Sequence, residues 1–215
     1  MRPDSLSKKA VPKPDFNLER QLMAQGFMRI AGIDEAGRGP LAGPVVVAAV
    51  MLDPENIPDG LNDSKKLSAK RREAVFEQII LCARITIVSA PPAKIENLNI
   101  RGATLWAMAK AAGSLSLPPD YALVDGRDVP DLMPCPAKAI IKGDRRSLSV
   151  AAASIVAKVT RDRMCTIMDG CFPEYGFSSH KGYGTTQHIT ALNALGASVY
   201  HRAFFAPVAA VLALK

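Results

Sequence analysis

Two adjacent acidic residues, Asp34 and Glu35, stand between two apolar stretches of the chain. The stretches at 29–33 and 45–52 are rich in β-branched or small apolar residues, which predicts two neighbouring buried strands. The acids then end a core strand, where a charge is costly to desolvate unless a partner offsets it. Because consecutive strand side chains point to opposite faces, both carboxylates serve one site only if the backbone bends or the site lies at the edge of the sheet.

A glycine-rich turn with one arginine follows the acids. Gly37, Gly39 and Gly43 permit a sharp bend and let a ligand approach the backbone, and Arg38 adds a guanidinium among them. Two acids, an exposed backbone and a guanidinium together indicate a site for metal ions and phosphate.

Two more acids follow short predicted strands. Asp125 comes after residues 121–124, and Asp144 comes after residues 137–141. In an open α/β sheet, ligands gather at the carboxyl ends of the strands. Carboxylates that converge there repel one another unless cations neutralise them, and their oxygens are ligands that Mg²⁺ and Mn²⁺ prefer. One acid at a strand end is ordinarily a turn residue, whereas acids at three strand ends predict a two-metal site for phosphodiester cleavage.

Several other residues have the chemistry of a polyanion site. Ser64, Lys65 and Lys66 offer a hydroxyl and two charges to phosphates, although lysines in a loop are usually only solvated. Lys158 lies on an alanine-rich helix and could equally reach solvent without a function. Tyr183 follows a glycine in a basic loop, where a ring can stack on a base or sugar, although a tyrosine is more often simply packed. The histidines have no Ser or Cys partner nearby in the sequence, so a Ser–His or Cys–His nucleophile is not expected.

Helices and strands alternate along the rest of the chain. A helix at 69–81, capped by Ser68, is followed by a β-branched strand at 84–89. The remaining predicted elements are a short helix followed by a longer one from about residue 100, a long helix at 147–168, a helix at 186–195 and an apolar helical tail at 207–214. This order predicts one domain built on a mixed α/β sheet with helices on its faces.

The first 27 residues differ in composition from the rest. Three prolines and three lysines in residues 1–27 predict a flexible basic arm, in which a short helix near 18–25 packs onto the domain. No role for this arm follows from its residues.

The overall charge is basic, with 27 Lys and Arg against 20 acids and a formal net charge of +7. This balance favours an anionic partner such as nucleic acid; a soluble protein that is basic for no functional reason is the alternative. The four cysteines form no C-x-x-C pair, so disulfide and zinc frameworks are not expected. Neither a secretory signal nor an apolar run long enough to span a bilayer appears, and we expect a cytoplasmic protein without a membrane partner.

Many of these residues lie in motifs that resemble those of the ribonuclease HII family, the type 2 ribonucleases H. The first motif, Asp34-Glu35-Ala-Gly37-Arg38-Gly39-Pro-Leu-Ala-Gly43-Pro44-Val, is highly specific. The others follow in the order typical of the family: Asp63-Ser64-Lys65-Lys66-Leu67, Val124-Asp125-Gly126, Lys142-Gly143-Asp144, Ala152-Ala-Ser154-Ile-Val-Ala-Lys158, Arg161-Asp162 and Lys181-Gly182-Tyr183. The resemblance covers roughly residues 28–208.

The resemblance implies a ribonuclease H-like fold, with a mixed five-stranded sheet flanked by helices in a catalytic domain at 28–215 and a helical C-terminal extension from about residue 170. It implies hydrolysis of the RNA strand of RNA–DNA hybrids and nicking on the 5′ side of a single ribonucleotide in duplex DNA. The products would carry 3′-hydroxyl and 5′-phosphate ends. Hybrid duplexes and ribonucleotide-containing DNA are therefore the expected partners of a monomer, and no protein partner can be named.

The resemblance also implies the roles of the acids. Asp34, Glu35, Asp125 and Asp144 would be the catalytic residues that bind two Mn²⁺ or Mg²⁺ ions. Asp162 is an alternative fourth acid, but it lies inside the predicted long helix with an arginine on each side, where a salt bridge is expected. We therefore select Asp144.

The turn and Tyr183 would recognise the substrate. Gly37, Arg38 and Gly39 would bind the 2′-hydroxyl and phosphates at the RNA–DNA junction, which agrees with the ability of an exposed glycine backbone to reach that hydroxyl. Tyr183 would pack on the sugar of the following deoxynucleotide. The chain departs from the family near its end, where Phe204 stands in place of the usual Ser of a His-Arg-x-Ser-Phe-x-Pro-Val run.

Two other hypotheses remain open. One is a nuclease or recombinase of the same fold that acts on all-DNA substrates. The other is a catalytically silent nucleic-acid-binding protein that uses only its basic face. Acids at three strand ends argue against a silent module, because uncompensated carboxylates weaken phosphate binding.

Overall fold

A mixed sheet of five strands forms the centre of the computed structural model, which describes residues 13–214. The strands are β1 (Ile30–Ala36), β2 (Val45–Met51), β3 (Arg84–Ala90), β4 (Tyr121–Asp125) and β5 (Ala137–Ile140). Their order is β3-β2-β1-β4-β5; β2 is antiparallel to both β1 and β3, whereas β4 is parallel to both β1 and β5. The predicted mixed five-stranded sheet is confirmed, and the carboxyl ends of β1, β4 and β5 lie at the same end of it.

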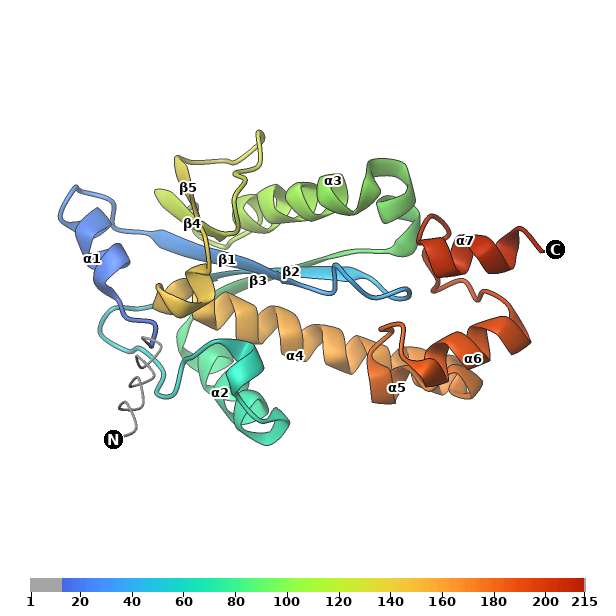
Figure 1. The fold of residues 1–215 in the computed structure, drawn as a ribbon. Helices are drawn as coiled ribbons and strands as arrows, with labels where there is room; N and C mark the ends of the chain where they lie inside the picture. The colour runs from blue at the N-terminus through green and yellow to red at the C-terminus, as the bar shows by residue number, and fades with distance from the viewer. Residues whose placement is uncertain (1–12, 215) are drawn as a thin grey trace, which may run out of the picture.

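Helices cover both faces of the sheet (Figure 1). The main ones are α3 (Pro92–Gly113) on one face, and α4 (Leu148–Cys171) with α2 (Ala69–Cys82) on the other. Side chains alternate accordingly, since Ile33 and Val47 pack in the cluster under α3, while Ala48 and Val50 pack in the cluster under α2 and α4. β2 is buried along its whole length, as expected for an apolar strand covered on both faces.

α4 approaches β1 closely because the residues at their contact are small. A Cβ atom built on Gly32 of β1 would lie 2.1 Å from the carbonyl carbon of Ser149, so only glycine fits at this crossing. The following Ala152 and Ala153 are fully buried. This contact fixes α4 along the sheet and holds its later turns beside the end of β1.

The boundaries of most elements agree with those predicted. α2 begins after Ser68, which caps it, and α3 is kinked at Asn99, so a short helix does precede a longer one. Two elements run further than predicted. α4 continues through Gly170, because one glycine costs a helix only about 1 kcal/mol. β1 continues to Ala36, so that both of its acids lie inside the strand and pair with β2.

The short helix predicted near residues 18–25 is present and packs onto the domain. α1 (Asn17–Met23) packs against apolar side chains of β1, β4 and β5. Glu19 is fully buried, and its Oε1 accepts hydrogen bonds from Ser147 Oγ at 2.6 Å and from the Ser149 N–H at 2.9 Å. A carboxylate is stabilised there because the N–H groups at the start of α4 face it. The structure therefore places residues 14–27 in the folded body, while residues 1–12 of the predicted arm lie outside the described residues.

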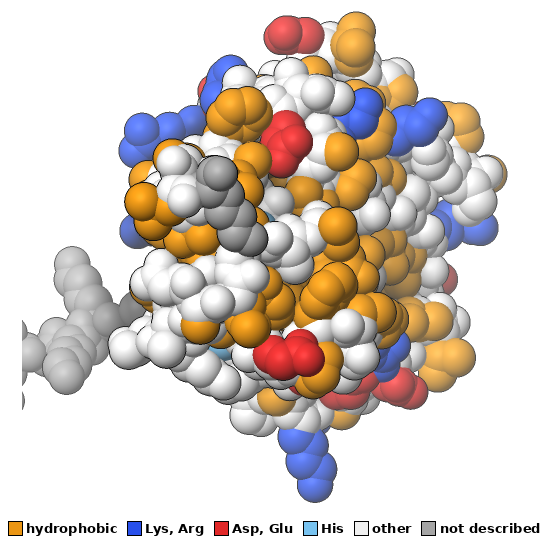
Figure 2. Space-filling model, turned by 90° about the vertical axis from the view of Figure 1, so that its right-hand side faces the viewer, with side chains coloured by type: hydrophobic (Ala, Val, Ile, Leu, Met, Phe, Trp, Pro, Cys, Tyr) orange, Lys and Arg blue, Asp and Glu red, His pale blue; other side chains and the backbone are white. Residues whose placement is uncertain are grey.

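The C-terminal extension is helical, as predicted, and lies at the opposite end of the molecule from α1 (Figure 1). It contains α5 (Phe177–His180), α6 (Thr186–Leu195) and α7 (Ala206–Leu212). Figure 2 looks onto this end and shows hydrophobic side chains gathered on it. Large exposed apolar residues include Ile167 in the last turns of α4, and Val199 and Phe204 between α6 and α7. Phe204 is 79% exposed, so this departure from the family pattern introduces no buried contact.

Short 3₁₀ helices complete the described part of the chain: η1 (Ser64–Lys66), η2 (Gly143–Arg145) and η3 (Pro173–Tyr175). All four cysteines are free thiols. Between residues 13 and 214, no helix combines the length and the apolar character needed to cross a membrane.

Candidate active site

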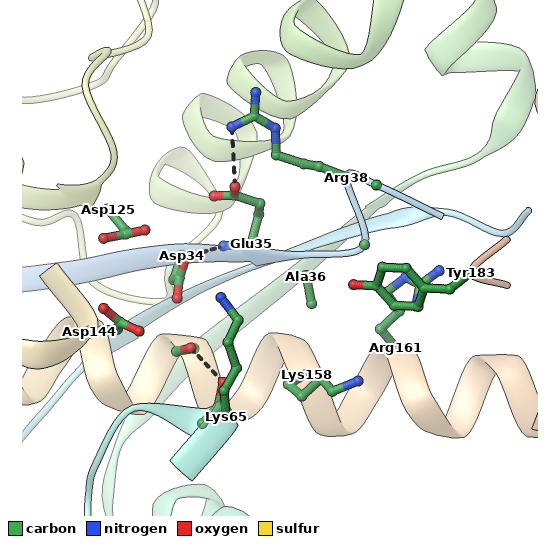
Figure 3. A pocket seen from close by; sticks show the side chains of 14 residues that line it. Asp34, Glu35, Ala36, Arg38, Lys65, Asp125, Asp144, Lys158, Arg161 and Tyr183 are labelled. Atoms are coloured by element: carbon green, nitrogen blue, oxygen red, sulfur yellow. Dashed lines mark hydrogen bonds and ion pairs between the residues drawn. The ribbon is translucent and has the colours of Figure 1, made fainter. Parts of the chain in front are cut away.

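The four candidate acids line one cavity of about 410 Å³. Asp34 and Glu35 belong to β1, Asp125 ends β4, and Asp144 lies in η2 just after β5 (Figure 3). Parallel pairing brings these strand ends together, which is why acids separated by up to 110 positions share a cavity.

Asp34 and Glu35 reach the cavity from opposite faces of β1 (Figure 3). Asp34 points toward α4, where a hydrogen bond from Ser154 partly offsets the burial of its charge. Glu35 points toward α3 and accepts a hydrogen bond from Arg38 Nη1 at 3.5 Å. Of the two arrangements expected, a bent backbone or a site at the edge of the sheet, the second is observed. The site lies at the edge formed by the carboxyl ends of β1, β4 and β5, where both faces are within reach.

Burial raises the pKa of all four acids above its ordinary value. Burial raises the pKa of Asp34 well above its ordinary value, and the charges of Glu35 and Asp125 raise it further. Neighbouring acids also raise the pKa of Asp144. The ionised site therefore contains repulsion that bound cations would relieve.

The acids are spread around the cavity rather than closed into a cage. Among residues 13–214, no group of three or more His, Cys, Asp or Glu side chains is arranged as a ready-made ion site. Asp125 Oδ1 accepts the Gly143 N–H at 2.6 Å, and Glu35 is paired with Arg38. Carboxylate oxygens suit Mg²⁺ or Mn²⁺, and their spread leaves coordination positions for water and substrate, as is usual for Mg²⁺.

η1 brings Lys65 to the cavity and leaves Lys66 outside it. Asp63 caps η1 by accepting the Lys65 N–H at 3.0 Å, and the Lys65 side chain extends toward the acids (Figure 3). Lys66 is exposed and does not line the cavity. Ser64 is buried in the wall, where its Oγ hydrogen bonds to Ser154 Oγ at 2.9 Å. Of the three residues predicted to meet phosphates, only Lys65 presents a charge inside the cavity.

An ion pair occupies the middle of α4. Lys158 lines the cavity, and its Nζ lies 2.7 Å from Asp162 Oδ1, which makes Lys158 more than a solvated side chain. Asp162 also lies 3.8 Å from Arg72 Nη1 and is not among the lining residues. The salt bridge expected of Asp162 is confirmed, whereas Asp144 does line the cavity.

The glycine-rich turn and Tyr183 lie on the far side of the cavity from Asp125 (Figure 3). A Cβ atom on Gly39 would lie 3.6 Å from Tyr183 Cε1, so the half-exposed ring flanks the turn. In the loops and turns of residues 13–214, the backbone N–H groups of Gly37, Arg38 and Gly39 donate no hydrogen bond to a backbone carbonyl. The turn thus presents backbone donors beside the acids.

The comparisons with known proteins agree with this geometry. The model of the family described as ribonuclease HII matches residues 31–208. A ribonuclease HII from Rhizobium leguminosarum bv. trifolii is 55% identical over 200 residues, which cover 93% of this chain and 87% of that protein. The chain belongs to the ribonuclease HII family. Membership makes it an endoribonuclease and implies activity on the RNA of RNA–DNA hybrids.

Solved structures support the same family. The ribonuclease H2 of Pyrococcus horikoshii OT3 superposes with a TM-score of 0.73 at 26% identity, over 86% of this chain and 97% of that one. A ribonuclease HII from Archaeoglobus fulgidus, solved in complex with PCNA, gives a TM-score of 0.73 at 30% identity, over 83% and 95% of the two chains. The ribonuclease H-like fold predicted from the sequence is confirmed.

Three residues near the site of this ribonuclease HII family member were not predicted. Ser154 and Arg161 line the cavity together with Lys158, at the i, i+4, i+7 spacing of one helix face, so helical periodicity could have indicated them. Arg202 donates a hydrogen bond to the carbonyl of Gly37, 165 positions away. No local pattern in the sequence signals such a contact.

Proposed function

We propose that this protein nicks duplex DNA on the 5′ side of a single embedded ribonucleotide and hydrolyses the RNA strand of RNA–DNA hybrids. The products carry 3′-hydroxyl and 5′-phosphate ends. One observation carries the proposal: four acids from three strand ends share a cavity with a glycine-rich turn whose N–H groups have no protein acceptor among the described loops. The acids suit phosphodiester hydrolysis, and the turn suits a hydroxyl or a phosphate.

Asp34, Glu35, Asp125 and Asp144 are the proposed ligands of two Mg²⁺ or Mn²⁺ ions, which would activate water and stabilise the leaving oxygen. The raised pKa values of these acids support this assignment: burial raises all four, and for Asp34, Glu35 and Asp144 neighbouring acids add a repulsion that cations would relieve. Lys65, which extends toward the acids, adds a positive charge to attract the scissile phosphate.

Ribose recognition is assigned to the turn. The 2′-hydroxyl is the group that distinguishes RNA from DNA, and the free N–H groups of Gly37, Arg38 and Gly39 are small enough donors to approach it. Tyr183 is proposed to pack on the sugar of the following deoxynucleotide, since its ring flanks Gly39 and is half-exposed. Lys158 contributes charge on the α4 side of the cavity.

Substitution of one acid tests the proposed chemistry. Nicking of a duplex with one ribonucleotide should require Mg²⁺ or Mn²⁺. Asp125→Asn should lower kcat by about two orders of magnitude or more, the range typical of groups that act on reacting atoms. Asp131→Asn is the matched control, because Asp131 is an exposed acid outside this cavity. Turnover by Asp125→Asn at the rate of the control would contradict the proposal.

A further inference from the structure

Two buried arginines lie behind the glycine-rich turn, and neither has an acidic partner. Arg161 of α4 and Arg202 of the C-terminal extension are each only 1% exposed. None of the ion pairs formed within residues 13–214 includes either residue. A buried charge without a counter-charge is costly, so other groups must compensate both guanidinium groups.

Backbone carbonyls provide this compensation. All six hydrogen bonds from the two side chains go to carbonyl oxygens, and five of the six acceptors belong to residues 37–44. Arg202 donates to Gly43 at 2.9 Å, Arg38 at 2.9 Å and Gly37 at 2.6 Å, and Arg161 donates to Pro44 at 3.1 Å, Lys181 at 3.1 Å and Ala42 at 3.3 Å. The two forks therefore hold the turn from its carbonyl side.

The turn held in this way lines the cavity beside the acids. Gly37 adopts φ +96°, and a Cβ atom there would lie 1.9 Å from Arg161 Nε, so the turn rests directly on the guanidinium. The N–H groups of Gly37, Arg38 and Gly39 have no acceptor among the described loop contacts. Carbonyls of the turn are thus occupied while three successive amides stay open, and successive open amides are a form that binds anions and hydroxyl oxygens.

Neutral side chains could have donated to these carbonyls at a lower cost. Burial and the charge of nearby Arg161 lower the pKa of Arg202 to about 9, which reports how unfavourable the second charge is. An amide such as Gln would avoid that cost. The retained charges are therefore best explained by a ligand, because two positive groups behind the open amides attract a phosphate to them.

We propose that Arg161 and Arg202 are positioning residues that hold the amide side of the turn toward the ribonucleotide and its phosphate. Both are proposed to act through the turn, whose carbonyls accept their hydrogen bonds. This inference rests on the proposed function, because it assigns to the same turn the two side chains that make it selective. It predicts that selectivity for ribose depends on the geometry of the Arg202 fork and not on fold stability alone.

The test measures selectivity in binding. In an Asp34→Asn background that does not cleave, the affinities for two duplexes that differ by one 2′-hydroxyl are compared, together with thermal unfolding. We expect about tenfold tighter binding of the ribonucleotide duplex, corresponding to about 1.4 kcal/mol. Adding Arg202→Lys, which keeps the charge but not the fork, should reduce this preference to about twofold.

A matched substitution shows whether replacing an arginine elsewhere in the protein also changes the binding preference. Arg163→Lys changes an exposed residue of α4 that pairs with Glu73, and it should keep the tenfold preference. An Arg202→Lys protein that is folded and keeps the preference overturns the inference while leaving the proposed function intact. If that variant does not fold, Arg161→Lys is measured in the same way; if neither folds, both arginines serve stability only and the inference is wrong. Absence of any preference in the Asp34→Asn parent would contradict the proposed function itself.

Discussion

At the scale of single residues, Asp34 shows most clearly that ionised acids in this site lower the stability of the fold. It is 5% exposed, lies inside a core strand and faces two other acids, so its pKa is raised well above the usual range. A carboxyl group whose pKa is raised by folding stabilises the fold when protonated, and this contribution is lost as pH rises through the raised pKa. Without bound cations, keeping Asp34 ionised therefore costs the fold stability.

Asp34→Asn should remove both this cost and the activity. Without divalent cations at pH 7.5, we expect the variant to be more stable than the unmodified protein by about 1 kcal/mol, a typical gain for a stabilising substitution. Thermal unfolding in EDTA measures the difference, and Asp131→Asn, which changes an exposed acid, should leave the midpoint unchanged. A lower midpoint for Asp34→Asn would show that the charge is already compensated without metal.

Which site residues could be predicted depended on whether their signal was local. Asp34, Glu35 and Asp125 end apolar strands beside glycines, and this pattern can be read from a few neighbouring residues. Lys66 has the same local pattern as Lys65, but the direction of each side chain depends on η1, which the sequence did not predict. Arg202 lies in the run that resembles the family's C-terminal motif, but nothing local in that run signals its contact with the glycine-rich turn.

At the scale of elements, a stack of histidines inside the C-terminal extension links the Tyr183 loop to residues 198–201. The rings of His180 and His188 stack with their centroids 4.4 Å apart, and His188 Nε2 lies 3.0 Å from His201 Nε2. His201 Nδ1 accepts the Ser198 N–H at 2.9 Å, and His188 Nδ1 faces the Tyr183 carbonyl at 2.9 Å. These contacts are satisfied when both rings are neutral, because a further proton would set two N–H groups against each other.

The stack makes stability depend on pH. Burial and the neighbouring His188 lower the pKa of His201 from 6.5 to about 4. A histidine with a lowered pKa contributes stability above its unfolded pKa of 6.5, and this stability is lost as pH falls toward 4. Between pH 7.5 and pH 4.5, this group should therefore cost the fold about 2–3 kcal/mol.

Comparison with His201→Asn isolates this contribution. The variant should be less stable at pH 7.5 but should lose less stability on acidification, since the carboxylates titrate equally in both proteins. Urea unfolding at several pH values gives both free energies of unfolding. The same pH dependence in the two proteins would mean that His201 is not held neutral by the stack.

The elements themselves were easier to predict than their contacts. Helix and strand patterns placed nearly every element, and Ser68 correctly marked the start of α2. The short N-terminal helix was predicted, but the contact that fixes it was not, because the prolines and lysines of this segment are local features. What fixes this segment is Glu19, which caps α4 about 130 residues later in the chain.

At the scale of the whole molecule, the site lies where the two halves of the sheet join. β1 is antiparallel to β2 on one side and parallel to β4 on the other, and the acids lie at its carboxyl end. The sequence indicated a mixed sheet, but the strand order could not be predicted because it depends on pairing between distant segments. The net charge of +7 agrees with a polyanionic substrate and predicts binding that weakens with salt.

The central claim is that one cavity both cleaves phosphodiesters and selects ribose. Mapping the products formed from a DNA duplex with a lone ribonucleotide, beside the identical all-DNA duplex, tests it most directly. We expect one metal-dependent nick on the 5′ side of the ribonucleotide, with 3′-hydroxyl and 5′-phosphate ends, and no cut in the all-DNA duplex. Equal cleavage of both duplexes, or a nick on the 3′ side, would contradict it.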